Sequence, residues 1–152
     1  MTRPREQLVS IADTPYYHVV SRCVRRTFLC GYDRDTGRNY EHRRQWVEDR
    51  IRILSSLFAI NICSYAVMSN HYHLVVKLFP EQAQEWGDDE VLARWSSLSK
   101  GPLIIQRYLK GESLASAERR FLESTVAVYR KRLTELSWFM KCLNEPIARQ
   151  AN

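Results

Sequence analysis

The amino-acid sequence predicts an α+β fold in which helices pack on one face of an antiparallel sheet. Three observations predict this class. Residues 14–22 form an aromatic and β-branched run, residues 60–79 form two such runs around a Ser-Asn turn, and apolar residues recur at helical spacing on either side of that pair. With 152 residues, of which 45% are hydrophobic and 26% charged, the chain suits one globular domain spanning residues 1–152.

In the first half of the chain, the pattern predicts a strand, a basic loop, a helix and a hairpin. Residues 14–22 predict the first strand, because β-branched and aromatic side chains favour extended backbone. Residues 23–42 carry two glycines among several arginines and predict a loop. Apolar spacings of three and four predict a helix over 43–58, and residues 60–68 and 71–79 predict a hairpin.

In the second half, the pattern is mainly helical. It predicts a polar helix over residues 81–99 with a break near Gly87, and leaves residues 103–109 as either a strand or a short helix. Pro146 predicts a kink or a restart of the last helix, with Asn144 as its cap. A narrow apolar seam runs through Leu122, Val126, Tyr129, Leu133, Leu136, Met140, Leu143 and Ile147. The seam predicts packing on this domain's own sheet or, alternatively, pairing with a second subunit.

The charge balance favours a polyanionic partner. The 23 Lys and Arg residues exceed the 17 Asp and Glu residues and give a net charge of +6, which favours nucleic acid, with scattered surface charge as the alternative. No apolar run approaches the roughly 18 residues that span a bilayer, and the polar N-terminus leads into no signal peptide. We therefore expect a cytoplasmic protein without a membrane segment. The four cysteines form no CxxC pair and are expected to be reduced thiols.

The sharpest feature of the sequence is the stretch His71-Tyr72-His73. Alternate residues of a strand point to one face, so both imidazoles project together, followed on that face by Val75 and Lys77. Two neighbouring imidazole nitrogens can bind a divalent metal. A His-x-His pair is a weak signal by itself, but its place after a tight turn at a sheet edge gives a substrate access to it.

Three stretches of the chain resemble one family of proteins. Residues 65–76, YAVMSNHYHLVV, closely resemble the HUH motif of single-tyrosine transposases, in particular that of the REP-associated tyrosine transposases. Residues 16–22, YYHVVSR, resemble their first strand, and residues 137–144, SWFMKCLN, with the following Ala148-Arg149, resemble their late helix. The resemblance covers most of the chain, and the histidine strand with its preceding Met-Ser-Asn is its most specific part.

The resemblance implies a ferredoxin-like sheet, a homodimer and chemistry on single-stranded DNA. In this family, two histidines of the motif and a third polar ligand hold Mg²⁺ or Mn²⁺, which polarises a scissile phosphate. A helix-borne tyrosine attacks that phosphate and leaves a 5′-phosphotyrosine link and a free 3′-OH. REP-type members recognise DNA hairpins that flank the cleavage site.

His71 and His73 match the motif directly, and His18 is our candidate for the third ligand. His18 is expected on the same type of face of a neighbouring strand, although a hydrogen-bonded core histidine is an equal alternative. The late helix, residues 143–152, contains no tyrosine. Tyr129 is the nearest helical candidate for the nucleophile, yet its place in the apolar seam favours a core residue. Two weaker candidates are Tyr108 and Tyr72.

A cluster of arginines is the second candidate site. The predicted DNA-binding residues are Arg22, Arg25, Arg26, Arg34, Arg38, Arg43 and Arg44, together with Lys77 on the histidine face. Arginine contacts phosphates, and the interleaved Tyr32 and Tyr40 can stack on unpaired bases. The alternative is a solvated, charged loop.

Taken together, these features predict a transposase that binds single-stranded or hairpin DNA and cleaves and rejoins it with the help of Mg²⁺ or Mn²⁺. The first alternative is a catalytically defective hairpin-DNA-binding module of the same fold. The second is an unrelated α+β protein with structural histidines and an RNA or protein partner. Since relatives continue past Asn152 with basic sequence, we expect this chain to be a shortened copy or a piece of a longer protein.

Overall fold

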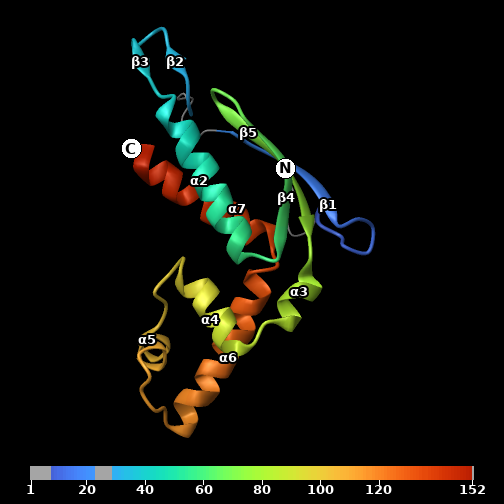
Figure 1. Ribbon diagram of the computed structural model, residues 1–152, viewed down its shortest axis with the longest axis vertical. Helices are drawn as coiled ribbons and strands as arrows, with labels where there is room; N and C mark the ends of the chain where they lie inside the picture. Colours follow the sequence, from blue (N-terminus) through green and yellow to red (C-terminus); the bar gives the residue numbers. More distant parts are fainter. Residues whose placement is uncertain (1–7, 23–28, 152) are drawn as a thin grey trace.

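The computed structural model describes residues 8–22 and 29–151, with only the backbone of Ala151. Within these ranges the chain forms a three-stranded antiparallel sheet, a separate two-stranded hairpin and six helices labelled α2 to α7 (Figure 1). The predicted α+β class is therefore confirmed.

The sheet has the strand order β1-β5-β4. Its strands are β1 (Tyr16–Arg22), β4 (Ile60–Val67) and β5 (His71–Leu78), close to the three strands that the sequence predicts. β5 is antiparallel to both neighbours, so β1 and β4 run parallel with β5 between them. Since α2 (His42–Leu57) lies between β1 and β4 in the chain, these elements form a split β-α-β arrangement.

One face of the sheet is covered by helices, and no helix of the described residues packs on the other, open face. Along β5 the side chains alternate between buried, beginning with Tyr72, and half-buried, beginning with His71. The buried series packs in the core with α2 and with the last helix, α7 (Leu136–Ala151), which lie next to each other on one side of the sheet (Figure 1). The two histidines of β5 therefore project from the opposite face.

The remaining helices form a lower part that continues from β5 (Figure 1). They are α3 (Pro80–Glu85), α4 (Asp88–Ser96), α5 (Leu103–Leu109) and α6 (Ser116–Arg132). The predicted break near Gly87 is confirmed, since α3 ends before it and α4 begins after it. Residues 103–109, for which the sequence allowed a strand or a short helix, form the helix α5. Arg130 of α6 contacts both α3 and α4. It donates a hydrogen bond to the carbonyl of Ala83 at 2.6 Å and forms an ion pair with Asp88 at 2.8 Å. In the part of the chain described here, no helix has both the length and the apolar character needed to cross a membrane.

The predicted apolar seam is divided between α6 and α7, and all of its residues are buried in this chain. The seam is therefore buried within this chain rather than exposed for a second subunit, but its α6 part packs mainly against α3, α4 and α5 and not on the sheet as predicted. The predicted restart of the last helix is wrong, because α7 continues through Pro146. Proline cannot donate to the carbonyl of residue 142, but Arg50 Nε donates to that carbonyl at 3.0 Å. The freed acceptor is thus satisfied, and Asn144 does not act as a helix cap.

The basic segment before α2 is more ordered than a simple loop. It contains a short hairpin of β2 (Tyr32–Asp33) and β3 (Arg38–Asn39), which projects beyond the sheet at the top of Figure 1. The buried Asp33 carboxylate closes the turn by accepting the backbone N–H of Asp35 at 3.0 Å and the hydroxyl of Thr36 at 2.7 Å.

Candidate functional site

Three histidines gather on the open face of the sheet. His18 Nε2 lies 2.9 Å from His73 Nδ1, and the two rings are stacked with centroids 5.1 Å apart. The ring of His71 meets that of His73 edge-on, with centroids 5.0 Å apart. The structure therefore places the three predicted ligands on one face and brings the nitrogens of two of them, His18 and His73, close together.

The strand register produces this grouping. On β5, His71 and His73 are two residues apart and share a face. Across the β1–β5 pair, Val20 lies opposite His73, so His18 is a diagonal neighbour of His73 on that face. His18 is exposed, so the alternative of a core histidine is wrong.

Leu29 and Cys30 stabilise the turn before β5 by hydrogen bonds. The backbone N–H of each donates to the carbonyl of Ser69, and the Cys30 thiol donates to the carbonyl of Met68 at 3.1 Å. Burial raises the pKa of the Cys30 thiol, which keeps the proton that this hydrogen bond uses. The segment just before the histidine strand is therefore fixed by contacts within the core.

Asn70 orients the first histidine of the motif. His71 Nδ1 lies 2.6 Å from Asn70 Oδ1, which can only accept a hydrogen bond. The proton of the neutral His71 ring is therefore on Nδ1, and Nε2 keeps the lone pair with which an imidazole binds a metal.

A second polar cluster lies behind the histidines, on the covered face. The hydroxyl groups of Tyr72 and Ser21 both donate to Asn144 Oδ1, the latter at 3.4 Å. Ser21 and Tyr72 are paired across β1 and β5, and Asn144 comes from α7. This cluster connects α7 to both histidine-bearing strands at the level of the site.

The donor atoms fit part of a divalent metal site. Two nitrogens at right angles on an ion, each at about 2.1 Å, lie about 3.0 Å apart, close to the 2.9 Å between His18 and His73. Of the two predicted ions, Mn²⁺ accepts nitrogen ligands more readily than Mg²⁺, which prefers oxygen. In residues 8–22 and 29–151, however, no three His, Cys, Asp or Glu side chains converge in a geometry that could hold a metal. The paired nitrogens fit, and the His71 ring is adjacent but held by Asn70.

Two predicted DNA-binding residues lie on the histidine face. Arg22 is opposite His71 in the register, and Lys77 is opposite Tyr16. Lys77 Nζ lies 5.2 Å from the centroid of the Tyr16 ring and 4.6 Å from that of Phe79. Positive charge and an exposed aromatic ring therefore flank the histidines on their own face.

The other predicted arginines lie elsewhere or are engaged in structure. Arg34 and Arg38 are exposed in the β2–β3 hairpin. Arg43 lies over the ring of Tyr40 at 4.2 Å. Arg44 pairs with Glu41 and donates to the carbonyl of Val67, so it holds α2 against the end of β4. Arg25 and Arg26 are outside the described residues.

The structure does not bring the candidate nucleophile Tyr129 to the histidines. Tyr129 is buried on α6, with its ring stacked on that of Trp95 at a centroid distance of 5.4 Å. Figure 1 shows α6 in the lower part of the molecule. Burial raises the pKa of the Tyr129 hydroxyl, which opposes formation of a phenolate nucleophile. Tyr108 donates to Asp89 at 2.6 Å in the same part, and Tyr72 faces α7. These are the contacts of structural tyrosines.

Tyr16 also lies on the histidine face, although we did not predict it as a site residue. It is exposed, and it precedes His18 by two positions on β1. Of the four tyrosines in the three-stranded sheet, Tyr16 alone shares the histidine face. The strand registers place Tyr17, Tyr65 and Tyr72 on the opposite face. The sequence signal for Tyr16 is its Tyr-x-His spacing, because residues two apart on a strand share a face.

In comparisons with known proteins, no family model, curated protein or solved structure matches the chain.

Proposed function

We propose that this chain is a metal-dependent transposase of the HUH kind, which binds single-stranded DNA on the histidine face and cleaves and rejoins it through a phosphotyrosine link. The observation that carries the proposal is the 2.9 Å separation of His18 Nε2 and His73 Nδ1. It joins the two strands whose sequences resemble the HUH family, on a face that no helix of the described chain covers.

The chain's own residues divide the work at this site. His18 and His73 would supply two metal-binding nitrogens, and Asn70 keeps the proton of His71 on Nδ1, which leaves the lone pair of its Nε2 on the adjacent ring. A divalent ion bound there would polarise a phosphoryl oxygen of the DNA strand. Because imidazoles are neutral ligands, the ion keeps its charge for the phosphate.

The flanking residues give the DNA strand a path across the face. Arg22 lies beside His71, and Lys77 lies six residues further along β5, about 20 Å away at the rise of an extended strand. Each cation can contact a phosphate on one side of the histidines. The exposed ring of Tyr16, beside Lys77, can stack on an unpaired base.

The ferredoxin-like topology is part of the same proposal. The described sheet contains the split β-α-β unit of β1, α2 and β4, and β4 forms a hairpin with β5. This arrangement matches three of the four strands of a ferredoxin-like sheet. In the described ranges, the outer edge of β1 pairs with no other strand. This edge is where we place the fourth strand.

The alternative is a module that binds hairpin DNA and does not cut it. Tyr129 supports this alternative, because it is buried against Trp95 and not presented to the histidines. Among the described tyrosines, the one on the histidine face, Tyr16, sits on a strand rather than a helix.

One experiment separates the two. The protein is incubated with end-labelled, single-stranded hairpin DNA and Mn²⁺, and covalent adducts are sought after denaturation in sodium dodecyl sulphate. The transposase forms an adduct that His73→Ala abolishes, while His42→Ala, a histidine on α2 that contacts Trp46, leaves it intact. Peptide mapping of the adduct, with Tyr16→Phe as a test variant, identifies the nucleophile.

The other outcomes are equally informative. Tight DNA binding without an adduct supports the binding module. Failure to bind single-stranded DNA at low salt contradicts both forms of the proposal, since binding by phosphate contacts is strongest there.

A further inference from the structure

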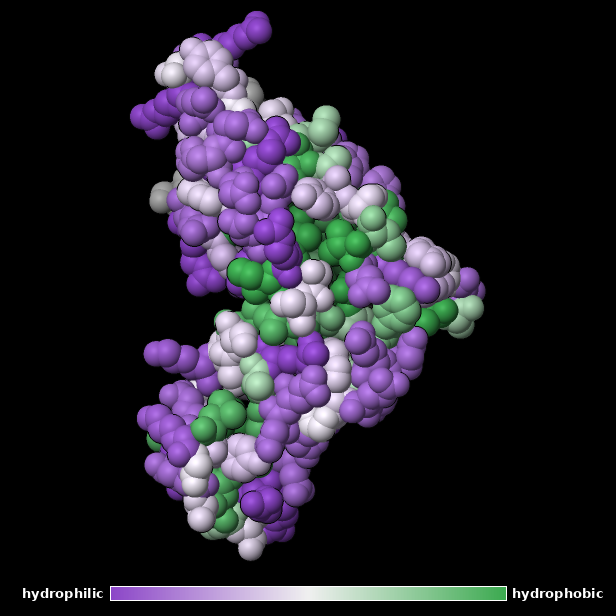
Figure 2. Space-filling model, viewed as in Figure 1, coloured by the Kyte–Doolittle hydropathy of each residue, from purple (hydrophilic) through white to green (hydrophobic). Residues whose placement is uncertain are grey.

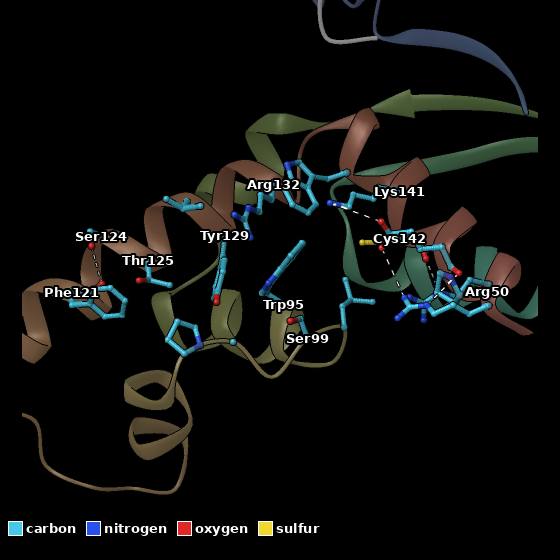
Figure 3. A pocket seen from close by; sticks show the side chains of 18 residues that line it. Arg50, Trp95, Ser99, Phe121, Ser124, Thr125, Tyr129, Arg132, Lys141 and Cys142 are labelled. Atoms are coloured by element: carbon cyan, nitrogen blue, oxygen red, sulfur yellow. Dashed lines mark hydrogen bonds and ion pairs between the residues drawn. The ribbon is translucent and has the colours of Figure 1, made fainter. Parts of the chain in front are cut away.

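A groove of about 810 Å³ lies on the helical side of the molecule. Its walls come from α6 and α7 and from the connection between α4 and α5, and Arg50 of α2 stands at one end (Figure 3). Figure 2 shows the surface indented between the upper part, which carries α2, and the lower helical part. The helix α7, which lines the groove, packs on the covered face of the sheet. The sheet therefore lies between the groove and the histidines.

Aromatic rings form the inner wall of the groove. Trp138 meets Trp95 edge-on, with centroids 5.5 Å apart, and Trp95 stacks on Tyr129. Trp138 is only half-buried, so part of its ring faces the groove. A partly exposed indole that is held perpendicular to a second indole is a platform on which another flat ring can stack.

Arg132 is held on these rings without a carboxylate partner among the described residues. Its guanidinium carbon lies 4.3 Å from the centroid of Trp138 and 5.3 Å from that of Trp95. Cation–π contacts orient the guanidinium and leave its N–H donors for an oxygen-bearing ligand.

The groove carries an excess of positive charge. Its charged lining residues are four cations and one carboxylate: Arg50, Arg132, Lys141, Arg149 and Glu145. Glu145 lies 4.0 Å from Lys141 and 3.9 Å from Arg149, so one carboxylate is shared loosely between two exposed cations. Such long, exposed pairs contribute little and are readily exchanged for a phosphate.

We infer that this groove is a second nucleic-acid site, which takes an extended single strand with a base on Trp138 and phosphates on Arg132, Lys141 and Arg149. From Trp138 to Arg149 the helix rises about 16 Å, enough to follow more than one phosphate. Stacking rings and cations side by side are the combination that single-stranded nucleic acid requires, whereas an acidic peptide would use the cations alone.

This inference rests on the proposed function for the identity of the polymer, but its residues are distinct from the histidine site. The strand segment in the groove is a different one from the segment on the histidines, since the sheet lies between them. The two sites can therefore be tested, and can fail, separately.

The test measures binding of fluorescein-labelled oligothymidine by fluorescence anisotropy at several salt concentrations. Lys141→Ala with Arg149→Ala removes two exposed groove cations and should weaken binding about tenfold or more at low salt, with the salt slope falling by about 1.4. The matched control is Arg119→Ala with Arg120→Ala, which removes two exposed cations of α6 that do not line the groove. The control should stay within about twofold of the parent protein.

A second readout follows the stacking surface itself. Oligothymidine should quench the tryptophan fluorescence of the parent protein, and Trp138→Phe should lose most of that quenching while keeping the circular dichroism spectrum of the fold. Equal weakening by the groove and control variants overturns the inference, as does unchanged quenching in Trp138→Phe or competition by polyglutamate as strong as by DNA. His73→Ala should abolish the covalent adduct and leave this quenching in place, which separates failure of the groove from failure of the proposed function.

Discussion

His18 Nε2 lies 2.9 Å from His73 Nδ1, although 55 positions separate the two residues in the chain. The contact depends on the register of β1 against β5, in which Val20 is opposite His73. A shift of one residue would turn His18 to the covered face and remove it from the site. The candidate site therefore depends on this strand register. Contacts on the other face of the sheet help to maintain the register.

Asn144→Ala should destabilise the protein by about 1–2 kcal/mol. The substitution removes the acceptor of two hydrogen bonds, from Tyr72 and from Ser21, and each such bond contributes about 1 kcal/mol. Urea denaturation followed by circular dichroism measures the change in the free energy of unfolding. Asn61→Ala, at an exposed position of β4, is the matched control and should be nearly neutral.

A double-mutant cycle shows whether the effect runs through Tyr72. Tyr72→Phe and Asn144→Ala should be less destabilising together than the sum of the two single changes, with a coupling of about 0.5–1.5 kcal/mol. Strictly additive effects would mean that the hydrogen bond between α7 and β5 does not stabilise the fold.

Arg50→Met should destabilise the protein by about 1–2 kcal/mol, and Pro146→Ala should reduce that cost. Arg50 Nε donates to the carbonyl of Cys142, the acceptor that Pro146 cannot reach from within α7. With alanine at 146, a backbone N–H becomes available for the same carbonyl. The free energies of unfolding of the two single variants and the double variant measure this; an Arg50→Met cost that is the same in both backgrounds would contradict it.

The thiols should react in an order set by burial. Cys63 is exposed, whereas burial raises the pKa of the Cys30 and Cys142 thiols above its ordinary value. A raised pKa means a smaller thiolate fraction at a pH of about 8, and the thiolate is the nucleophile. N-ethylmaleimide labelling followed by peptide mass spectrometry should therefore modify Cys63 before Cys30 and Cys142.

Denaturant provides the control for this order. In urea the environments become alike, so the differences in labelling rate between Cys30, Cys63 and Cys142 should largely disappear. Labelling of Cys142 in the folded protein as fast as that of Cys63 would show that α7 is not packed as described.

Period-two and helical patterns predict much of this fold because each reflects burial on one face. Alternation in residues 71–78 predicts which β5 side chains are buried, and helical spacing in 43–58 predicts α2 to within a residue. The same alternation predicts that His71 and His73 share a face. That His18 joins them also follows, once the two strands are taken as neighbours.

What sequence reasoning missed depends on contacts between distant residues. Nothing local indicates that Arg50 satisfies the carbonyl freed by Pro146, so a continuous α7 was not predicted. The β2–β3 hairpin was missed because its strands are two residues each, and Asp33 rather than apolar alternation stabilises its turn. The groove beside Trp138 joins residues of α2, α4, α6 and α7, which no single stretch of sequence reveals.

The most direct test of the central claim is the affinity of the protein for Mn²⁺, measured by isothermal titration calorimetry without DNA. We expect the parent protein to bind one ion, His18→Ala to weaken binding by at least about tenfold, and His42→Ala to leave it unchanged. Absence of Mn²⁺ binding, or binding that His18→Ala and His73→Ala do not weaken, would contradict a metal site at these histidines.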